Sequence, residues 1–413
     1  MDTFKNLNQA ITHRIEQSEQ GRITFAEFMA LALYQPEFGY YAANKTKTQS
    51  GNEAVIGPQG DFVTSPHMGH DFGELLAEQF FDMWQGLGQP EGFTLVEAGA
   101  GQGLIASDAI AHIHHHYPDL AKCLDYVVIE RSPTLRAEQQ QRLSHWQARG
   151  LSIRWQTLKD IANQSIVGCV FSNELFDAFP VHWVERHNQV WREMWVANAE
   201  RGFVPVLESL STPKIEDYLQ RTEIDFDQGY VEGYRTEVNL AALDWLEQIS
   251  QKLNRGYVLT IDYGYSAQRY YSPARREGTL QCYYQHSHHN DPFAYVGQQD
   301  ITAHVNFTAL EQHGDALGLE KIGFTQQGLF LMALGLGDRL ATIAQPGAQP
   351  VAASKEQAAK PIDIQSIMRR REALQQLISP MGLGNFGVLI QGKGLMQKEI
   401  ARPLKGLTIP PLM

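Results

Sequence analysis

The sequence predicts an α/β fold in which a mostly parallel sheet is covered by helices on both faces. Apolar, strand-like segments alternate with helical patterns from about residue 91 onward, which is typical of parallel sheets. The first of these strands ends in a glycine-rich loop that opens a helix, and later strands end in acidic residues. Because open α/β sheets bind ligands at the carboxyl ends of their strands, this pattern also indicates where a site lies.

Composition limits the possible functions. The chain has 413 residues, 43% of them hydrophobic and 19% charged, which is a globular composition sufficient for two or three domains. Its net charge of −12 argues against broad, charge-driven binding of nucleic acid, although the C-terminal end from residue 351 is basic. The three cysteines, Cys123, Cys169 and Cys282, form no CxxC pair, which favours a reducing compartment.

The start of the chain carries no targeting signal of a familiar kind. It lacks the apolar stretch of a signal peptide and contains acids early, unlike a transit peptide. The most apolar window, residues 328–337, is too short to span a bilayer. We therefore expect a cytoplasmic protein of bacterial type, without membrane insertion.

The first 90 residues are predicted to form a helical region with a long loop. Residues 4–34 are helical in pattern, and Thr24 and Glu27 have the spacing of a capping box. Residues 39–66 are rich in Gly, Ser, Thr and Asn, as loops are. A further helix is expected over residues 69–87, where apolar residues recur on one helical face.

Residues 91–345 are predicted to hold the α/β core. Its expected strands are Thr94–Ala98, Tyr126–Glu130, Ser152–Trp155, Val167–Ser172 and Tyr257–Asp262. The helix after the second strand is expected to begin at Ser132-Pro133, a favourable cap and first turn. Residues 346–413 add a linker, a helix over 362–378 and a last strand, Phe386–Gly392.

An insertion at about residues 181–240 interrupts the core. Residues 181–196 are predicted to form a hairpin that turns at residues 187–189, followed by an acidic, less regular stretch over 198–227. The hairpin contains three tryptophans, Trp183, Trp191 and Trp195. We expect them to lie in a core, while a dimer surface is the alternative.

The glycine loop LVEAGAGQG, residues 95–103, is the strongest local signal. Gly99, Gly101 and Gly103 would let the backbone approach a ligand, and Glu97 ends the strand before them. A dinucleotide-binding loop would place its third glycine at Leu104. The spacing therefore favours S-adenosyl-L-methionine (SAM) over NAD, although glycine turns also occur as plain strand–helix connections.

Acidic and amide side chains follow three other strands. Glu130 is placed to bind ribose hydroxyls, or alternatively to form a salt bridge. Asn173 could hold the cofactor, and Glu174 and Asp177 could face a cationic acceptor, because carboxylates orient a guanidinium group. Asp262 lies at the same sheet edge. Helix capping for the first cluster and a turn for Asp262 are the alternatives.

Two histidine clusters are predicted not to bind metal. The first lies on one helix and lacks an HExxH motif or cysteine ligands. The second is looser in spacing. Their members are His112, His114, His115 and His116, and His286, His288, His289 and Asp291.

Taken together, these segments resemble the MidA-type family of SAM-dependent methyltransferases, which includes a mitochondrial arginine methyltransferase. The matching motifs are GYY (39–41), GDFVTSP (60–66), FGELLA (72–77), LVEAGAGQG (95–103), NELFDAFPV (173–181), DYGY (262–265), TLQCYYQH (279–286) and DITAHVNF (300–307). The chain departs from the family pattern at His67, Gln281 and Asn306.

The resemblance implies a class I methyltransferase with a Rossmann-like sheet, SAM as cofactor and S-adenosylhomocysteine as product. It implies that Thr64 and Ser65 contact the methyl donor and that Asp300 and His304 line the acceptor channel. The expected reaction is methyl transfer to a nitrogen of a protein, with arginine as the favoured acceptor. Glu174, Asp177, Asp262 and His304 are the candidate catalytic residues. A SAM-binding assembly protein without turnover and an NAD-dependent oxidoreductase are the alternatives.

Overall fold

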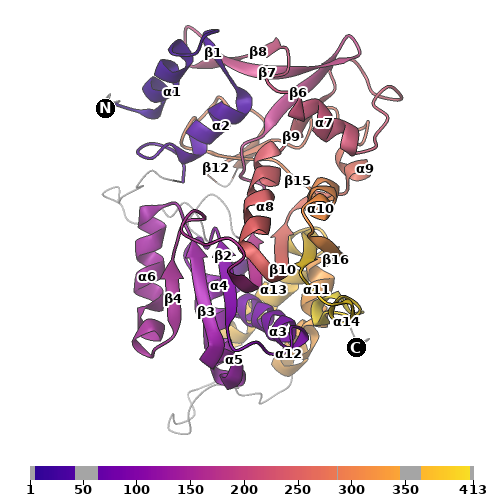
Figure 1. Cartoon of the computed structure of the whole chain (residues 1–413). Helices are drawn as coiled ribbons and strands as arrows, with labels where there is room; N and C mark the ends of the chain where they lie inside the picture. The colour runs from indigo at the N-terminus through magenta and orange to yellow at the C-terminus, as the bar shows by residue number, and fades with distance from the viewer. Residues whose placement is uncertain (1–4, 42–63, 286, 345–363, 410–413) are drawn as a thin grey trace.

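The computed structural model describes residues 5–41, 64–285, 287–344 and 364–409. Its elements form a lower part around a seven-stranded sheet and an upper part around a five-stranded sheet (Figure 1). Within the described ranges, no helix is both long and apolar enough to cross a bilayer. The linker expected over residues 345–359 lies outside these ranges.

The seven-stranded sheet has the order β16-β17-β10-β5-β2-β3-β4. Its strands are β2 (Phe93–Ala98), β3 (Leu124–Ile129), β4 (Ser152–Trp155), β5 (Ile166–Asn173), β10 (Leu253–Asp262), β16 (Glu320–Gln326) and β17 (Gly387–Lys393). The first five are parallel, while β17 runs antiparallel between β10 and β16. The predicted α/β class and mostly parallel sheet are confirmed, and β16 is the strand that the sequence did not reveal.

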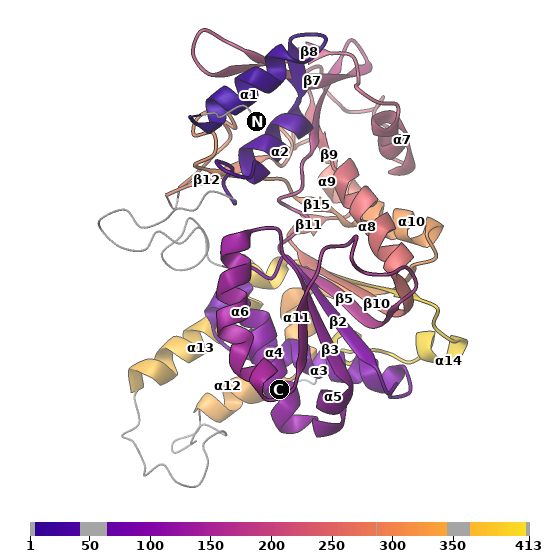
Figure 2. The same cartoon turned by 60° about the vertical axis from the view of Figure 1, so that its left-hand side comes forward.

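Helices cover both faces of this sheet, as Figure 2 makes visible. Leu95 packs with one group of helices and Val96 with the other, because successive side chains of a strand point to opposite faces. The first group is α3 (Asp71–Gly86), α4 (Leu104–His116), α5 (Pro118–Cys123), α6 (Pro133–Ala148), α11 (Gln327–Ala333), α12 (Leu336–Ala344) and α13 (Ile364–Ile378). The second is α8 (Leu240–Lys252) and α10 (Phe307–Ala316).

The upper sheet joins the N-terminal segment to the insertion. Its order is β1-β7-β6-β9, and β8 lies off this path and also pairs with β7. Its strands are β1 (Arg22–Thr24), β6 (His182–His187), β7 (Val190–Asn198), β8 (Phe203–Glu208) and β9 (Arg235–Val238). The predicted hairpin is confirmed, and it turns through Asn188 and Gln189 with φ values of 49° and 62°, as tight hairpin turns require.

Two local expectations need correction. The helical pattern over residues 4–34 is broken by β1, where the β-branched Ile23 pairs with Val196, and leaves α1 (Leu7–Glu16) and α2 (Phe25–Tyr34). Thr24 does cap α2, since its hydroxyl accepts the Glu27 amide at 3.1 Å. The stretch expected to be irregular over 198–227 contains β8 and α7 (Lys214–Arg221).

Hydrophobic packing divides the N-terminal region between the two parts. Helices α1 and α2 pack against the upper sheet, whereas α3 packs against the lower one. Trp183 is buried against Phe25, with ring centroids 5.2 Å apart, which confirms its predicted core position. Trp191 is partly buried against Phe226, and Trp195 remains partly exposed.

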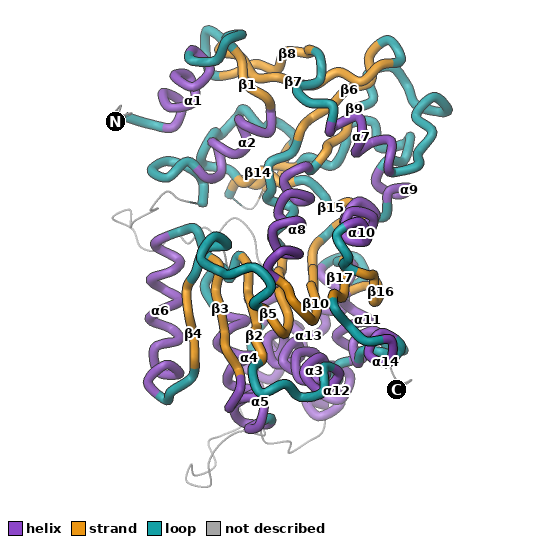
Figure 3. The backbone as a smooth tube through the Cα atoms, in the orientation of Figure 1, coloured by secondary structure: helices purple, strands orange, loops and turns teal. Residues whose placement is uncertain are grey.

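Short elements connect the two parts above the carboxyl ends of the parallel strands (Figure 3). They comprise the parallel pair β11 (Gly264–Tyr265) and β15 (Val305–Asn306), the helix α9 (Ala267–Tyr270) and a three-stranded sheet of β12 (Gln281–Tyr284), β13 (Ser287–His289) and β14 (Asp300–Thr302). The 3-10 turn η1 (Ser65–Met68) and the helix α14 (Gln397–Ile400) complete the elements that matter here. The carboxyl edge of the sheet is thus covered by the upper part, as a ligand site requires.

Candidate cofactor and acceptor site

The glycine loop between β2 and α4 takes a conformation that favours glycine at three positions. Gly99, Gly101 and Gly103 have φ values of 70°, 52° and 74°. A Cβ atom at Gly99 would lie 2.9 Å from Leu175, and one at Gly103 would lie 3.1 Å from Gln139. A Cβ atom at Gly101 would meet no protein atom within 4 Å. Gly101 therefore borders open space at the end of β2, where a ligand can approach the backbone.

Glu97 lies beneath this loop and is almost fully buried. Its Oε2 atom accepts a hydrogen bond from the Tyr126 hydroxyl at 2.7 Å. Burial raises the pKa of Glu97 to about 8, although the Tyr126 hydrogen bond acts in the opposite direction. The side chain is therefore mostly protonated at neutral pH.

Glu130 follows β3 and is held by a glutamine that the sequence did not single out. The Gln139 amide donates to the Gly101 carbonyl at 2.7 Å and to Glu130 Oε2 at 3.3 Å. Its own oxygen accepts from Trp155 at 2.9 Å. Gln139 is fully buried, but it is the first of three successive glutamines, so only the fold distinguishes it.

Thr64 and Ser65 lie beside both ligand loops, while residues 60–63 of the same motif are outside the described ranges. The Thr64 hydroxyl hydrogen-bonds His67 Nδ1 at 2.8 Å, and His67 Nε2 lies 3.2 Å from Gln102 Oε1 in the glycine loop. The Ser65 amide donates to Glu174 Oε1 at 3.2 Å. His67 departs from the family pattern, yet it connects η1 to the glycine loop.

The turn after β5 is strained at Glu174, whose φ is 52° although it is not glycine. Its Oε1 atom also accepts from the Asn173 amide at 3.0 Å. Burial raises the pKa of Glu174 to about 8, and the nearby Asp177 adds to this effect. The turn thus holds a carboxyl group that readily carries a proton.

Asp262 anchors this turn from the end of β10. Its Oδ2 atom accepts backbone amides of residues 175, 176 and 177 at 3.1, 2.9 and 3.4 Å, and its Oδ1 atom accepts that of Tyr263 at 2.8 Å. The residue is fully buried. Because its carboxylate is taken up by four amides, we assign Asp262 a positioning role and not direct contact with an acceptor.

Asp177, in contrast, has one carboxylate oxygen that accepts no hydrogen bond from the described residues. Its Oδ2 atom accepts from the Tyr263 hydroxyl at 2.7 Å, whereas its buried Oδ1 atom has no hydrogen-bond partner within the described part of the chain. The Oδ1 atom of Asn173 is in the same situation. Burial raises the pKa of Asp177 to about 6. Unpaired buried acceptors are costly, so both atoms point to a ligand that donates hydrogen bonds.

Tyrosines of the upper part enclose this acidic group. The Tyr34 hydroxyl donates to the Ala178 carbonyl at 2.7 Å, and its ring stacks on that of Tyr41 at 5.6 Å. The Tyr41 hydroxyl donates to the Asp300 carboxylate at 2.9 Å. Burial and the charges of Asp300 and Asp177 raise the pKa of Tyr34. Tyr34 and Tyr41 are not among the site residues that the sequence predicts individually.

His304 lies at the edge of this group. Its ring stacks on Tyr265 with centroids 5.0 Å apart and meets Tyr263 edge-on at the same distance. Burial lowers the pKa of His304 to about 4, and the charge of Arg275 contributes. The imidazole is therefore neutral at physiological pH. His286, named in the second histidine cluster, lies outside the described residues.

The two other departures from the family pattern have local structural roles. Gln281 accepts a hydrogen bond from the Tyr283 hydroxyl at 2.8 Å. Asn306 caps α10, where its Oδ1 atom accepts the Ala309 amide at 3.3 Å. Both side chains therefore have a place in the fold that does not involve an acceptor.

Two groups of potential metal ligands, around His112 and around His70, are paired with cations or with one another. His112 Nε2 lies 2.8 Å from Glu78 Oε1. His70, Asp71 and Glu74 lie close enough to share an ion, but Arg339 pairs with both carboxylates. Arginine thus already balances the charge of the group that most resembles a metal site.

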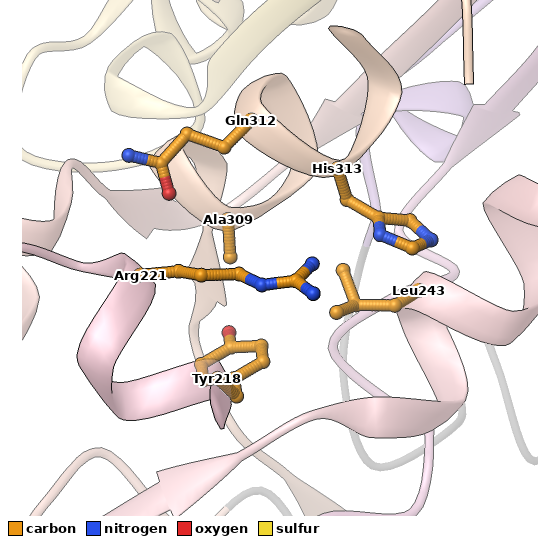
Figure 4. Close-up of a pocket in the computed structure, with 6 residues that line it drawn as sticks. All are labelled: Tyr218, Arg221, Leu243, Ala309, Gln312 and His313. Carbon is orange, nitrogen blue, oxygen red and sulfur yellow. The ribbon is translucent and has the colours of Figure 1, made fainter. Parts of the chain in front are cut away.

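Figure 4 shows a small pocket that is separate from this site. Its volume of about 10 Å³ is enough for roughly one water molecule. It lies between α7, α8 and α10, and none of the predicted site residues lines it. Its lining residues are Tyr218, Arg221, Leu243, Ala309, Gln312 and His313.

Comparisons with known proteins agree with this geometry. The model of a family described as "Putative S-adenosyl-L-methionine-dependent methyltransferase" matches residues 75–325. Protein arginine methyltransferase NDUFAF7, mitochondrial, of Mus musculus is 28% identical over 80% of this chain and 75% of its own. The Drosophila melanogaster homolog is 28% identical over 76% and 72%.

A solved structure extends the likeness to nearly the whole chain. A protein from Burkholderia thailandensis, crystallised with S-adenosyl-homocysteine, is 31% identical and has a TM-score of 0.78. The match covers 96% of this chain and 95% of that one. The fold, the cofactor and the family predicted from the sequence are thereby confirmed.

Proposed function

This chain belongs to the MidA-type family of SAM-dependent methyltransferases, and we propose that it methylates a nitrogen of arginine side chains in a protein. The observation that carries the proposal is the buried Oδ1 atom of Asp177, which has no donor among the described residues. A guanidinium group offers five N–H donors in one plane and a positive charge. The names of the relatives, at 28% identity, point to the same acceptor.

The cofactor side of the site fits SAM. When bound, SAM supplies a methyl group on a sulfonium and thus needs no further activation. Gly101 leaves its backbone accessible, and Glu130 would accept hydrogen bonds from ribose hydroxyls. Asn173 has a side-chain oxygen without a donor in the described part of the chain, and this oxygen would accept from the amino group. Thr64 is placed beside the glycine loop through His67.

The acceptor side orients the substrate and takes up a proton. Asp177 and Glu174 would hold the guanidinium, while the Tyr263 hydroxyl holds Asp177 in place through its hydrogen bond to Oδ2. The nitrogen that gains a methyl group must lose one proton. We assign Asp177 as the acceptor of that proton, because its pKa of about 6 leaves it ionised at neutral pH.

Product analysis tests the acceptor class. The purified chain is incubated with SAM carrying a labelled methyl group and with a total protein extract, and the labelled proteins are hydrolysed to identify the methylated amino acid. Methylarginine supports the proposal. Label in another side chain or in a small molecule overturns it, and binding of S-adenosylhomocysteine without any transfer favours the assembly-protein alternative.

One variant and its control test whether Glu174 belongs to the acceptor site. Glu174→Gln keeps the size of the side chain but cannot ionise beside a bound guanidinium, so we expect transfer to fall at least about tenfold while S-adenosylhomocysteine still binds. Glu247→Gln on α8 changes an exposed glutamate and serves as the matched control. Full transfer by Glu174→Gln would remove Glu174 from the acceptor site.

A further inference from the structure

Two arginines from the C-terminal part of the chain hold the residue that follows η1. Arg370 on α13 binds Asp71 through two parallel hydrogen bonds, from Nε to Oδ2 at 2.8 Å and from Nη2 to Oδ1 at 2.7 Å. Arg339 on α12 donates to the same Oδ1 atom at 2.6 Å. Asp71 is buried and begins α3, three residues after η1 ends.

A second buried connection reaches η1 itself. The Ser65 hydroxyl and the Gln327 side chain lie within hydrogen-bond distance, at 3.1 Å to Nε2 and 3.2 Å to Oε1. The Gln327 amide also donates to the Leu377 carbonyl of α13 at 3.4 Å. Both Ser65 and Gln327 are fully buried. Helix α13 therefore supports η1 at both of its ends.

Turn η1 in turn contacts both loops of the cofactor site. Its Ser65 amide bonds Glu174 in the turn after β5, and His67 reaches Gln102 in the glycine loop. A displacement of η1 would therefore disturb both loops at once. Because α13 packs directly on η1, the position of this helix is transmitted to the cofactor site.

We propose that Arg370 and Arg339 are positioning residues for SAM, which act by holding Asp71 and thereby docking η1 onto the two cofactor loops. The C-terminal region, which follows the residues 75–325 that the family model matches, would thus complete the cofactor site. The inference concerns the cofactor alone and does not depend on the identity of the acceptor.

The electrostatics of Asp71 agree with firm pairing to Arg370 and Arg339. Burial by itself raises the pKa of Asp71, but the hydrogen bonds and charges of Arg370 and Arg339 outweigh it and bring the pKa down to about 2. Charge-assisted, bidentate pairs are short and directional, so they define a position more narrowly than a single contact does. Asp71 stays ionised and paired throughout the physiological pH range.

Calorimetric titration with S-adenosylhomocysteine tests the proposal. Arg370→Ala should raise its Kd about tenfold, as expected if η1 is docked in roughly a tenth of the molecules. Arg371→Ala, a change at the exposed neighbouring arginine, should leave Kd as in the wild type. Hydrogen–deuterium exchange should accelerate at the backbone amides of Ser65, His67 and Met68 in Arg370→Ala only.

Other outcomes would overturn the proposal. A folded Arg370→Ala that binds S-adenosylhomocysteine within twofold of the wild type would show that the pair serves stability alone, even if Tm falls. If Arg370→Ala does not fold, Arg370→Lys decides, because it keeps the charge but cannot form the two parallel bonds. Weaker binding by Arg370→Lys supports the proposal, and unchanged binding overturns it.

Discussion

The hydroxyl of Tyr263 donates a hydrogen bond to Oδ2 of Asp177 at 2.7 Å, while the other oxygen of that carboxylate is buried without a donor among the described residues. One half of the carboxylate is thus held by the protein and the other half is left for a ligand. The two residues follow different strands, β10 and β5, which are neighbours in the sheet. In the proposed function, the pair would form the floor of the acceptor site.

Removal of this hydroxyl should change the pH dependence of methyl transfer. The Tyr263 hydrogen bond lowers the pKa of Asp177, which burial raises to about 6. In Tyr263→Phe this pKa should rise, so that the acidic limb of the rate profile moves to higher pH. Transfer near neutral pH should fall about two- to fivefold, as measured with labelled SAM between pH 5 and 9.

A matched variant separates this effect from a general loss of packing. Tyr230→Phe removes a tyrosine hydrogen bond to the Tyr271 carbonyl, away from the acidic group. Its pH profile should coincide with that of the wild type. An unshifted acidic limb in Tyr263→Phe would mean that Asp177 does not govern the rate.

Gly101→Val should abolish cofactor binding. A Cβ atom at Gly101 meets no protein atom within 4 Å, so a side chain there would occupy ligand space. Gly21→Val is the control, because Gly21 has a similar φ of 64° and equally free surroundings. Both variants should lose about 1–2 kcal/mol of stability from backbone strain, but only Gly101→Val should lose S-adenosylhomocysteine binding by calorimetry. Wild-type affinity in a folded Gly101→Val would contradict the assigned cofactor position.

Asp262→Asn should destabilise the fold, in keeping with a positioning role. The asparagine NH₂ group would face backbone N–H groups whose hydrogen bonds Asp262 now accepts, so that two donors would oppose each other. We expect this to cost about 1–3 kcal/mol in the free energy of unfolding. Asp177→Asn should instead leave stability equal or higher, while transfer falls. Urea denaturation of both variants checks the contrast, and wild-type stability of Asp262→Asn with lost transfer would make Asp262 catalytic.

Glu97 should make the protein less stable as pH rises. Its pKa is about 8 in the folded chain against 4.5 as the ordinary value, so unfolding releases a proton throughout this window. Stability is therefore unaffected below about pH 4.5, falls as pH rises toward 8, and levels off above it. Glu97→Gln lacks this loss and should gain about 2–4 kcal/mol at pH 8.

Thermal denaturation at pH 5 and pH 8 measures this difference. The Tm advantage of Glu97→Gln should be larger at the higher pH. Glu91→Gln, a change at an exposed glutamate just before β2, should track the wild type at both values. An equal pH dependence for Glu97→Gln and the wild type would show that Glu97 is ionised in the folded state.

The parts of the fold that follow local rules could be predicted from the sequence. Continuous apolar strands, the caps at Thr24 and Ser132 and the glycine loop each depend on neighbours in the chain, and the structure places them as expected. Strand β16 was missed because its residues are all exposed or half-buried and show no clear alternation. Strand β1 was read as helix because its three residues gain their pairing from β7, more than 170 residues later.

The candidate site, too, combines features that the sequence predicts with features that only the fold decides. By itself, the sequence determined the cofactor loop, the acids at the strand ends and the family, because these depend on residue type and on spacing along one strand and its loop. Only the tertiary structure decided which carboxylates already accept hydrogen bonds from the protein and which have an oxygen available to a ligand. Asp262 accepts hydrogen bonds from the amides of a turn 85–87 residues earlier, whereas one oxygen of Asp177 has no donor among the described residues. It also decided that Arg370 meets Asp71 across 299 residues. Hydrogen bonds form between groups that are close in space, and the fold brings such groups together from distant positions in the chain.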